Sequence, residues 1–136
     1  MTNKRKIYMN GKFIEESEAQ ISIFDSALMF GDMVFEMTRS FNKEHFKLKE
    51  HIDRLFTGLK ILRYNLSISK DELYNICIET AKINEPAFKK DDEHRLMIDI
   101  SRGVLGIYED IKGIHRGPNI IVADFPLRWT VKGMSK

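Results

Sequence analysis

The first part of the chain contains short stretches in which apolar and polar residues alternate, a period of two that is typical of β-strands. Residues 6–14 carry two such runs on either side of Asn10-Gly11. This dipeptide tolerates positive φ at both centres of a type I′ turn, so the pattern predicts a β-hairpin. Further along, Asp25-Ser26 is suited to capping a short helical turn that ends before Gly31.

The alternation is strongest in residues 33–41, which are predicted to form a longer strand. Residues 42–45 form a polar turn, after which Phe46 and Leu48 alternate again. We therefore expect a second strand through Phe46 and Leu48 that pairs with the first.

From residue 49 the apolar period changes to that of an amphipathic helix. The residues on its apolar stripe are Ile52, Leu55, Phe56, Leu59 and Leu62. A second helix is predicted to begin at Ser69, whose spacing to Glu72 fits a capping box, and to continue until Pro86. Cys77 lies on the inward side of this helix and is interpreted as a core residue.

Two β-branched-rich segments, residues 95–101 and 119–125, are predicted to be buried strands. Residues 102–118 join them and contain four glycines, a length and composition more typical of a binding loop or lid than of a plain connection. The order of strands, two helices and strands predicts an α+β fold. In it, the two main helices pack on one side of a mostly antiparallel sheet.

The composition agrees with one globular domain and gives no support for a nucleic-acid or membrane partner. The 136 residues are 43% hydrophobic and 31% charged, and the net charge of +2 gives no sign of a nucleic-acid or membrane partner. No apolar run has the length of a transmembrane helix or a signal peptide. Cys77 is the single cysteine, which excludes an internal disulfide and favours a reducing, cytoplasmic location.

Two acidic groups are candidates for catalysis or metal binding, but a structural role is favoured for both. On the predicted strand, Asp32 and Glu36 share a face about 13 Å apart, too far for an acid/base pair. Residues 91–94 hold three acids and a histidine, yet a contiguous run without a glycine turn wraps an ion poorly. We interpret it as a solvated, charged link. The glycines of residues 102–118 match no nucleotide-binding motif, and no metal-binding spacing occurs.

Arg54 is the most informative charged residue of the first predicted helix. At 100° per residue it lies about 130–140° from the centre of the apolar stripe, so we expect it to project away from the core. An arginine in such a position is most often solvated. A permanently charged, planar guanidinium is equally suited to binding a phosphate dianion.

Four motifs occur in one order and spacing: Tyr8-Met9-Asn10-Gly11, Ser22-Ile23-Phe24-Asp25, Phe30-Gly31-Asp32-Met33-Val34-Phe35-Glu36 and His51-Ile52-Asp53-Arg54-Leu55. Together they resemble the small N-terminal domain of the class IV (fold type IV) pyridoxal-phosphate enzymes over about residues 6–126. This family contains branched-chain and D-amino-acid transaminases and aminodeoxychorismate lyases.

The resemblance implies a role for several side chains. Arg54, in the motif H-x-x-R-L, would bind the phosphate of pyridoxal 5′-phosphate. Phe35 would line the substrate pocket, and Phe30 stands where branched-chain enzymes tend to have Tyr and other members Phe. Arg95 resembles the arginine with which branched-chain enzymes accept the side-chain carboxylate of glutamate, and Arg39 is a second candidate on the substrate side.

The resemblance also implies that residues 1–126 are an N-terminal domain and residues 127–136 an interdomain linker or tail. Relatives carry the Schiff-base lysine in a C-terminal catalytic domain, which would lie beyond Lys136 and is absent from this sequence. Lys132 and Lys136 follow the last predicted strand without a family motif, and we interpret them as solvated.

We therefore expect the N-terminal half of a homodimeric, pyridoxal-phosphate-dependent aminotransferase that is inactive alone. Its substrates would be an amino acid, with branched-chain side chains favoured, and a 2-oxo acid. Three alternatives remain: a D-amino acid transaminase, an aminodeoxychorismate lyase, or a non-catalytic dimerisation module.

Overall fold

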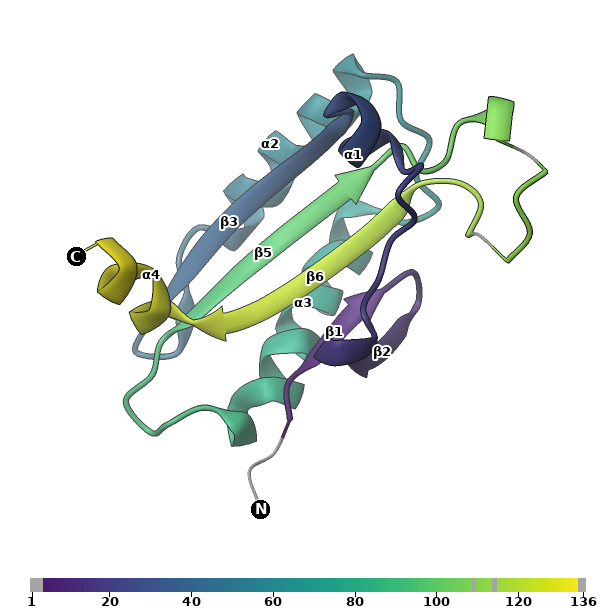
Figure 1. Cartoon of the computed structure of the whole chain (residues 1–136). Coiled ribbons are helices and arrows are strands. Elements are labelled where there is room, and N and C mark those ends of the chain that lie inside the picture. The colour runs from purple at the N-terminus through teal and green to yellow at the C-terminus, as the bar shows by residue number, and fades with distance from the viewer. Residues whose placement is uncertain (1–3, 109, 114, 135–136) are drawn as a thin grey trace.

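The computed structural model describes residues 4–108, 110–113 and 115–134, and the side chains among them up to residue 130. In this part of the chain, six strands form one antiparallel sheet in the order β2-β1-β6-β5-β3-β4 (Figure 1). The strands are β1 (Lys6–Met9), β2 (Lys12–Glu15), β3 (Met33–Phe41), β4 (Glu44–His45), β5 (His94–Ser101) and β6 (Asn119–Pro126). The α-helices are α1 (Ser26–Phe30), α2 (Leu48–Ile61), α3 (Lys70–Asn84) and α4 (Leu127–Met134), with short 3₁₀ turns at Glu16–Glu18, Glu85–Ala87 and Gly106–Tyr108.

The predicted hairpin is confirmed, because β1 and β2 pair across Asn10-Gly11, where φ is 50° and 94°. The strand predicted through Phe46 and Leu48 is wrong. Asn42 and Lys43 both adopt positive φ and reverse the chain early, so β4 pairs with β3 only at Glu44 and His45. Lys47, at φ 53°, then turns the chain again, and Leu48 is already the first residue of α2.

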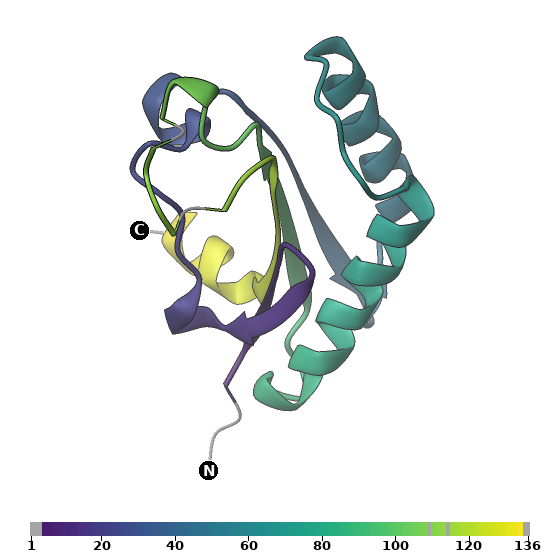
Figure 2. The ribbon, with the colours of Figure 1, turned by 90° about the vertical axis from the view of Figure 1, so that its right-hand side faces the viewer.

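The two long helices cover one face of the sheet, as predicted (Figure 2). The core between helices and sheet contains Ile52, Leu55 and Leu59 of α2, Leu73 and Cys77 of α3, Leu96, Ile98 and Ile100 of β5 and Val122 of β6. The capping box at the start of α3 is present, since the Ser69 hydroxyl accepts from Glu72 N and the Glu72 carboxylate accepts from Ser69 N.

The opposite face of the sheet, called the open face here, has no long helix over it. Because side chains alternate along a strand, the residues that alternate with the buried Leu96, Ile98 and Ile100 point to this face. Residues of the open face are Met33, Phe35, Met37 and Arg39 of β3, Arg95, Met97 and Asp99 of β5, and Ile121, Ala123 and Phe125 of β6. The short helices α1 and α4 and the loop between β5 and β6 lie at its margins (Figures 1 and 2).

The expected tail after β6 begins as a helix. The Trp129 ring stacks on Phe125 with a centroid distance of 6.2 Å, and the Arg5 guanidinium lies 4.4 Å from the Trp129 ring. Arg128 Nε donates to Asp92 Oδ1 over 2.7 Å. Residues 127–130 of α4 are therefore packed against the domain.

The charged run at residues 91–94 is not the solvated link that we expected. Asp92 is 6% exposed because Arg128 covers it, and His94 is 2% exposed at the start of β5. Within the described part of the chain, no helix has the length and apolar content that crossing a bilayer requires.

Candidate active site

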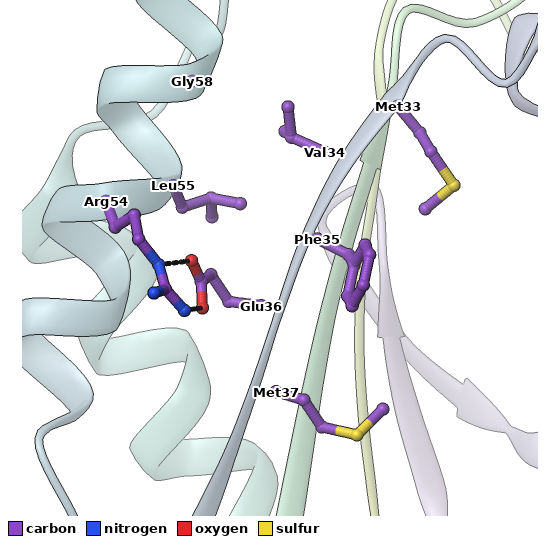
Figure 3. Close-up of a pocket in the computed structure, with 8 residues that line it drawn as sticks. All are labelled: Met33, Val34, Phe35, Glu36, Met37, Arg54, Leu55 and Gly58. Carbon is purple, nitrogen blue, oxygen red and sulfur yellow. Dashed lines mark hydrogen bonds and ion pairs between the residues drawn. The ribbon is translucent and has the colours of Figure 1, made fainter.

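Strand β3 is the outermost long strand of the sheet, with only the two-residue β4 beyond it. β4 pairs with it only at Ser40 and Phe41, so the segment from Met33 to Met37 has one edge without a neighbouring strand. A cavity of about 520 Å³ lies between this edge and α2 (Figure 3). Its lining residues are Met33, Val34, Phe35, Glu36, Met37, Arg54, Leu55 and Gly58.

Arg54 reaches this cavity from α2 and meets Glu36 of β3 (Figure 3). Its Nε donates to Glu36 Oε1 over 2.5 Å and its Nη2 to Oε2 over 2.7 Å. His51, one turn earlier on α2, lies with Nδ1 2.8 Å from the same Oε2. The hydrogen bonds from Arg54, with that from His51, hold the pKa of the Glu36 carboxyl below its usual range despite burial.

The predicted outward orientation of Arg54 is confirmed, since its side chain is 72% exposed while that of Glu36 is 6% exposed. The ion pair occupies one edge of the guanidinium. The other edge, formed by Nη1 and the second hydrogen of Nη2, has no partner among the described residues. A guanidinium offers five N–H donors, so this group retains three donors without a described partner, which suits it to binding a pair of phosphate oxygens.

Phe35 follows the alternation of β3 and points to the open face, away from the Arg54 and Glu36 side (Figure 3). It is 61% exposed. The cavity therefore continues around the edge of β3, with Arg54 on the helix side and Phe35 on the open face.

Arg39 and Arg95 lie directly opposite one another in the register of β3 and β5. Neither has an acidic partner among the described residues: Arg39 Nε donates to Ser40 O, and Arg95 Nε donates to Met37 Sδ. Like charges opposite each other on one sheet face are destabilising unless an anion lies between them. The Arg39 guanidinium lies 3.8 Å from the Phe41 ring, whereas Arg95 turns toward Met37, so the two head groups diverge along β3. Each is by itself suited to binding a carboxylate on the open face.

Phe30 is brought to the opposite end of β3. Asp25 accepts a hydrogen bond from Ala27 N at the start of α1, and Gly31 ends the helix at φ 70°. This arrangement leaves the Phe30 side chain 63% exposed just before β3. Since Met33 and Arg39 are about 20 Å apart along the strand, Phe30 does not lie beside the arginine pair.

Two features of the site were not foreseen from the sequence. Asp99 lies on the open face opposite Phe35, where burial raises the pKa of its carboxyl. His51 joins the Glu36–Arg54 pair, and its spacing of three residues from Arg54 on a helix was a signal that the two share a face.

Asp32 lies just before β3 rather than on the strand, where we expected it, but it has the structural role that we favoured. Burial acts to raise the pKa of its carboxyl, but hydrogen bonds from Arg102 Nε, at 2.6 Å, and Tyr64 Oη, at 2.5 Å, hold it below its usual value. Of the two lysines near the end of the sequence, Lys136 and the side chain of Lys132 lie outside the described residues.

Known proteins resemble this chain in both sequence and structure. The model of the class IV aminotransferase family matches residues 33–135. A Methanocaldococcus jannaschii protein named for branched-chain-amino-acid aminotransferase activity is 40% identical over 102 residues, which are 75% of this chain and 34% of that protein. Aminodeoxychorismate lyase of Bacillus subtilis is 36% identical over 98 residues, 72% of this chain and 32% of the lyase.

Among solved structures, the branched-chain amino acid aminotransferase of Escherichia coli superposes with a TM-score of 0.74 at 26% identity, over 93% of this chain and 42% of the enzyme. The chain thus spans about a third of the length of the curated relatives that it matches. The structural comparison agrees with the α+β architecture. The chain belongs to the class IV aminotransferase family.

Proposed function

We propose that this chain is the N-terminal half of a pyridoxal-phosphate-dependent aminotransferase that transfers an amino group between a branched-chain amino acid and a 2-oxo acid. The observation that carries the proposal is the placement of Arg54. Its guanidinium is mostly exposed, keeps three donors free and lies in the cavity at the edge of β3. Membership of the class IV family supports the same chemistry.

In this proposal each charged group has a separate task. Arg54 binds the cofactor phosphate from the helix side of β3, and Arg39 and Arg95 bind a substrate carboxylate on the open face. Phe35, which lines the cavity from the open face, forms an apolar wall between these sites. The bound cofactor supplies an electron sink for the amino-group transfer.

The chemistry of such enzymes also needs a lysine that bonds to the cofactor. We place that lysine in a C-terminal domain outside this sequence, so the chain alone is inactive, and we propose that the parent protein is a homodimer in the cytoplasm. Phe30 would contribute to the substrate pocket from the end of β3 near α1.

Two other activities remain within the same family. The similarity to aminodeoxychorismate lyase keeps a lyase as a candidate, and a D-amino acid transaminase would use the same phosphate site. A product assay of the parent protein, with L- and D-amino acids and with aminodeoxychorismate, distinguishes the branched-chain transaminase, the D-amino acid transaminase and the lyase. Arg39 and Arg95 suit all three activities, because each of these substrates carries a carboxylate.

The phosphate site is testable in this chain by itself. We expect pyridoxine 5′-phosphate, which has the phosphate but no reactive aldehyde, to shift the NMR signals of Arg54 saturably. Arg54→Gln should weaken binding at least about ten-fold, because it removes the charged donors. Lys60→Gln, which removes an exposed cation from the last turn of α2, is the matched control and should keep the affinity. A folded, monodisperse wild-type chain without phosphate affinity would instead favour a non-catalytic dimerisation module.

A further inference from the structure

Glu36 is a buried carboxylate whose oxygens are both occupied by basic residues of α2. It is 5% exposed, on the face of β3 that α2 covers. Oε1 accepts from Arg54 Nε, and Oε2 accepts from Arg54 Nη2 and lies within hydrogen-bond distance of His51 Nδ1. Glu36 is thus fixed from two points that are three residues apart on one helix.

Arg54 is the opposite case, a long side chain of which 72% is exposed. A flexible arginine in this position would sample many rotamers, and ordering it on binding costs free energy. The two parallel hydrogen bonds to Glu36 remove most of that freedom before any ligand arrives. They also decide which edge of the guanidinium faces Glu36 and which edge is left free (Figure 3).

We infer that Glu36 is the positioning residue of the phosphate site, orienting Arg54 so that its Nη1 and Nη2 edge is presented to an incoming phosphate. This inference rests on the proposed function, since it concerns the same ligand. Glu36 itself does not contact the phosphate in this arrangement. His51 helps to hold Glu36 in this orientation, because its Nδ1 lies within hydrogen-bond distance of Oε2, the same oxygen that accepts from Arg54 Nη2.

One effect acts against this role. The negative charge of Glu36 lies beside the phosphate site and repels a dianion, although water screens the exposed side of the pair. If repulsion by the Glu36 charge is the larger effect, removing that charge strengthens phosphate binding. If the orientation of Arg54 is the larger effect, shortening the Glu36 side chain while keeping its charge weakens binding. The two cases therefore predict different results for the same pair of variants.

The test compares Glu36→Asp with Glu36→Gln, using inorganic phosphate and pyridoxine 5′-phosphate as probes. Aspartate keeps the charge but is one methylene too short to reach both Nε and Nη2 from the β3 backbone. We expect it to weaken binding of both probes about three- to ten-fold, the cost of ordering one long side chain. Glutamine sets an amide donor against Nη2, and we expect it to weaken binding too. Glu50→Asp, the same change at an exposed position of α2, is the matched control and should keep the affinity.

Wild-type affinity in a folded Glu36→Asp variant overturns the inference, whether or not Glu36→Gln strengthens binding. If neither variant folds, the wild-type NMR spectrum decides. An oriented guanidinium gives separate Nη1 and Nη2 proton signals before phosphate is added, whereas a single averaged signal contradicts the inference. Absence of any saturable phosphate shift in the wild-type chain refutes the proposed function, and this inference with it. If the wild-type chain binds phosphate and the Glu36 variants bind it with the same affinity, only the inference about Glu36 is refuted.

Discussion

Asp25 shows how one buried side chain holds the beginning of the site in place. It is 0% exposed, and Oδ1 accepts from Ala27 N over 2.8 Å as the cap of α1. Oδ2 accepts from Ser101 Oγ over 2.9 Å and from Asn119 Nδ2 over 2.5 Å. The carboxylate therefore links α1 to the ends of β5 and β6.

Asp25→Ala should reduce the free energy of unfolding by about 3 kcal/mol, because it removes the helix cap and leaves two buried donors without an acceptor. Urea denaturation followed by circular dichroism measures the loss. Asp91→Ala, at an exposed position, is the control and should change stability by less than about 0.5 kcal/mol. Equal losses in both variants would contradict the role given to Asp25.

Single residues also show how far the sequence predicts the site. The helical wheel placed Arg54 outside the core, which its exposure confirms. The partner of Arg54 could not be predicted, since Glu36 lies 18 residues earlier and meets it only because α2 packs on β3. Asp92 was misjudged for a similar reason: Arg128, which covers it, is 36 residues away.

At the scale of elements, local patterns were reliable where the required contacts were also local. The capping box before α3 joins residues three apart and is present as predicted. The strand predicted through Leu48 is wrong because three residues that are not glycine, Asn42, Lys43 and Lys47, adopt positive φ there. Such conformations are uncommon for lysine, and they leave no mark in the apolar pattern.

The cap of α3 gives a prediction at this scale. Ser69→Ala should lower the free energy of unfolding by about 1 kcal/mol, because the first turn of the helix loses one partner for its free N–H groups. Ser69→Asp, which retains an acceptor at the cap, should restore most of the loss. Thermal unfolding monitored by circular dichroism distinguishes the two variants, and an equal loss in both would show that the cap contributes nothing.

At the scale of the whole molecule, His94 joins segments that are far apart in the sequence. Its ring is 2% exposed, with Nδ1 2.7 Å from Asp124 Oδ2 of β6 and Nε2 at Glu85 Oε2 beyond α3. Its backbone N–H donates to Ser40 Oγ of β3. Burial acts to lower the pKa of the imidazole, but the hydrogen bonds with Asp124 and Glu85 outweigh it and raise this pKa above its usual value.

A raised pKa in the folded state means that protonated His94 stabilises the fold. This contribution is complete below about pH 6.5, the usual value for histidine, and is lost as pH rises through the folded pKa. Neighbouring His45 acts in a different range, because burial lowers its pKa and its effect falls below about pH 6.5.

We therefore expect the wild-type chain to lose stability as the pH rises above about 6.5 and passes the folded pKa of His94. His94→Gln should be less stable at pH 6 and should lose less of its remaining stability over that rise. Urea midpoints measured from pH 6 to pH 9 test this, with His115→Gln, an exposed position, as the control. A slope unchanged by His94→Gln would contradict the assignment.

The sequence by itself determined most of the periodic elements and the α+β class, because a helix stripe, an alternating strand and a capping box are set by residues close together in the chain. Its motifs resembled those of the family to which the chain belongs. Tertiary structure decided the Glu36–His51–Arg54 cluster, the opposed Arg39 and Arg95 and the buried His94. Each of these depends on strand register or on a helix packed over a sheet edge. Such contacts join residues from 15 to 56 positions apart, and no local pattern specifies them.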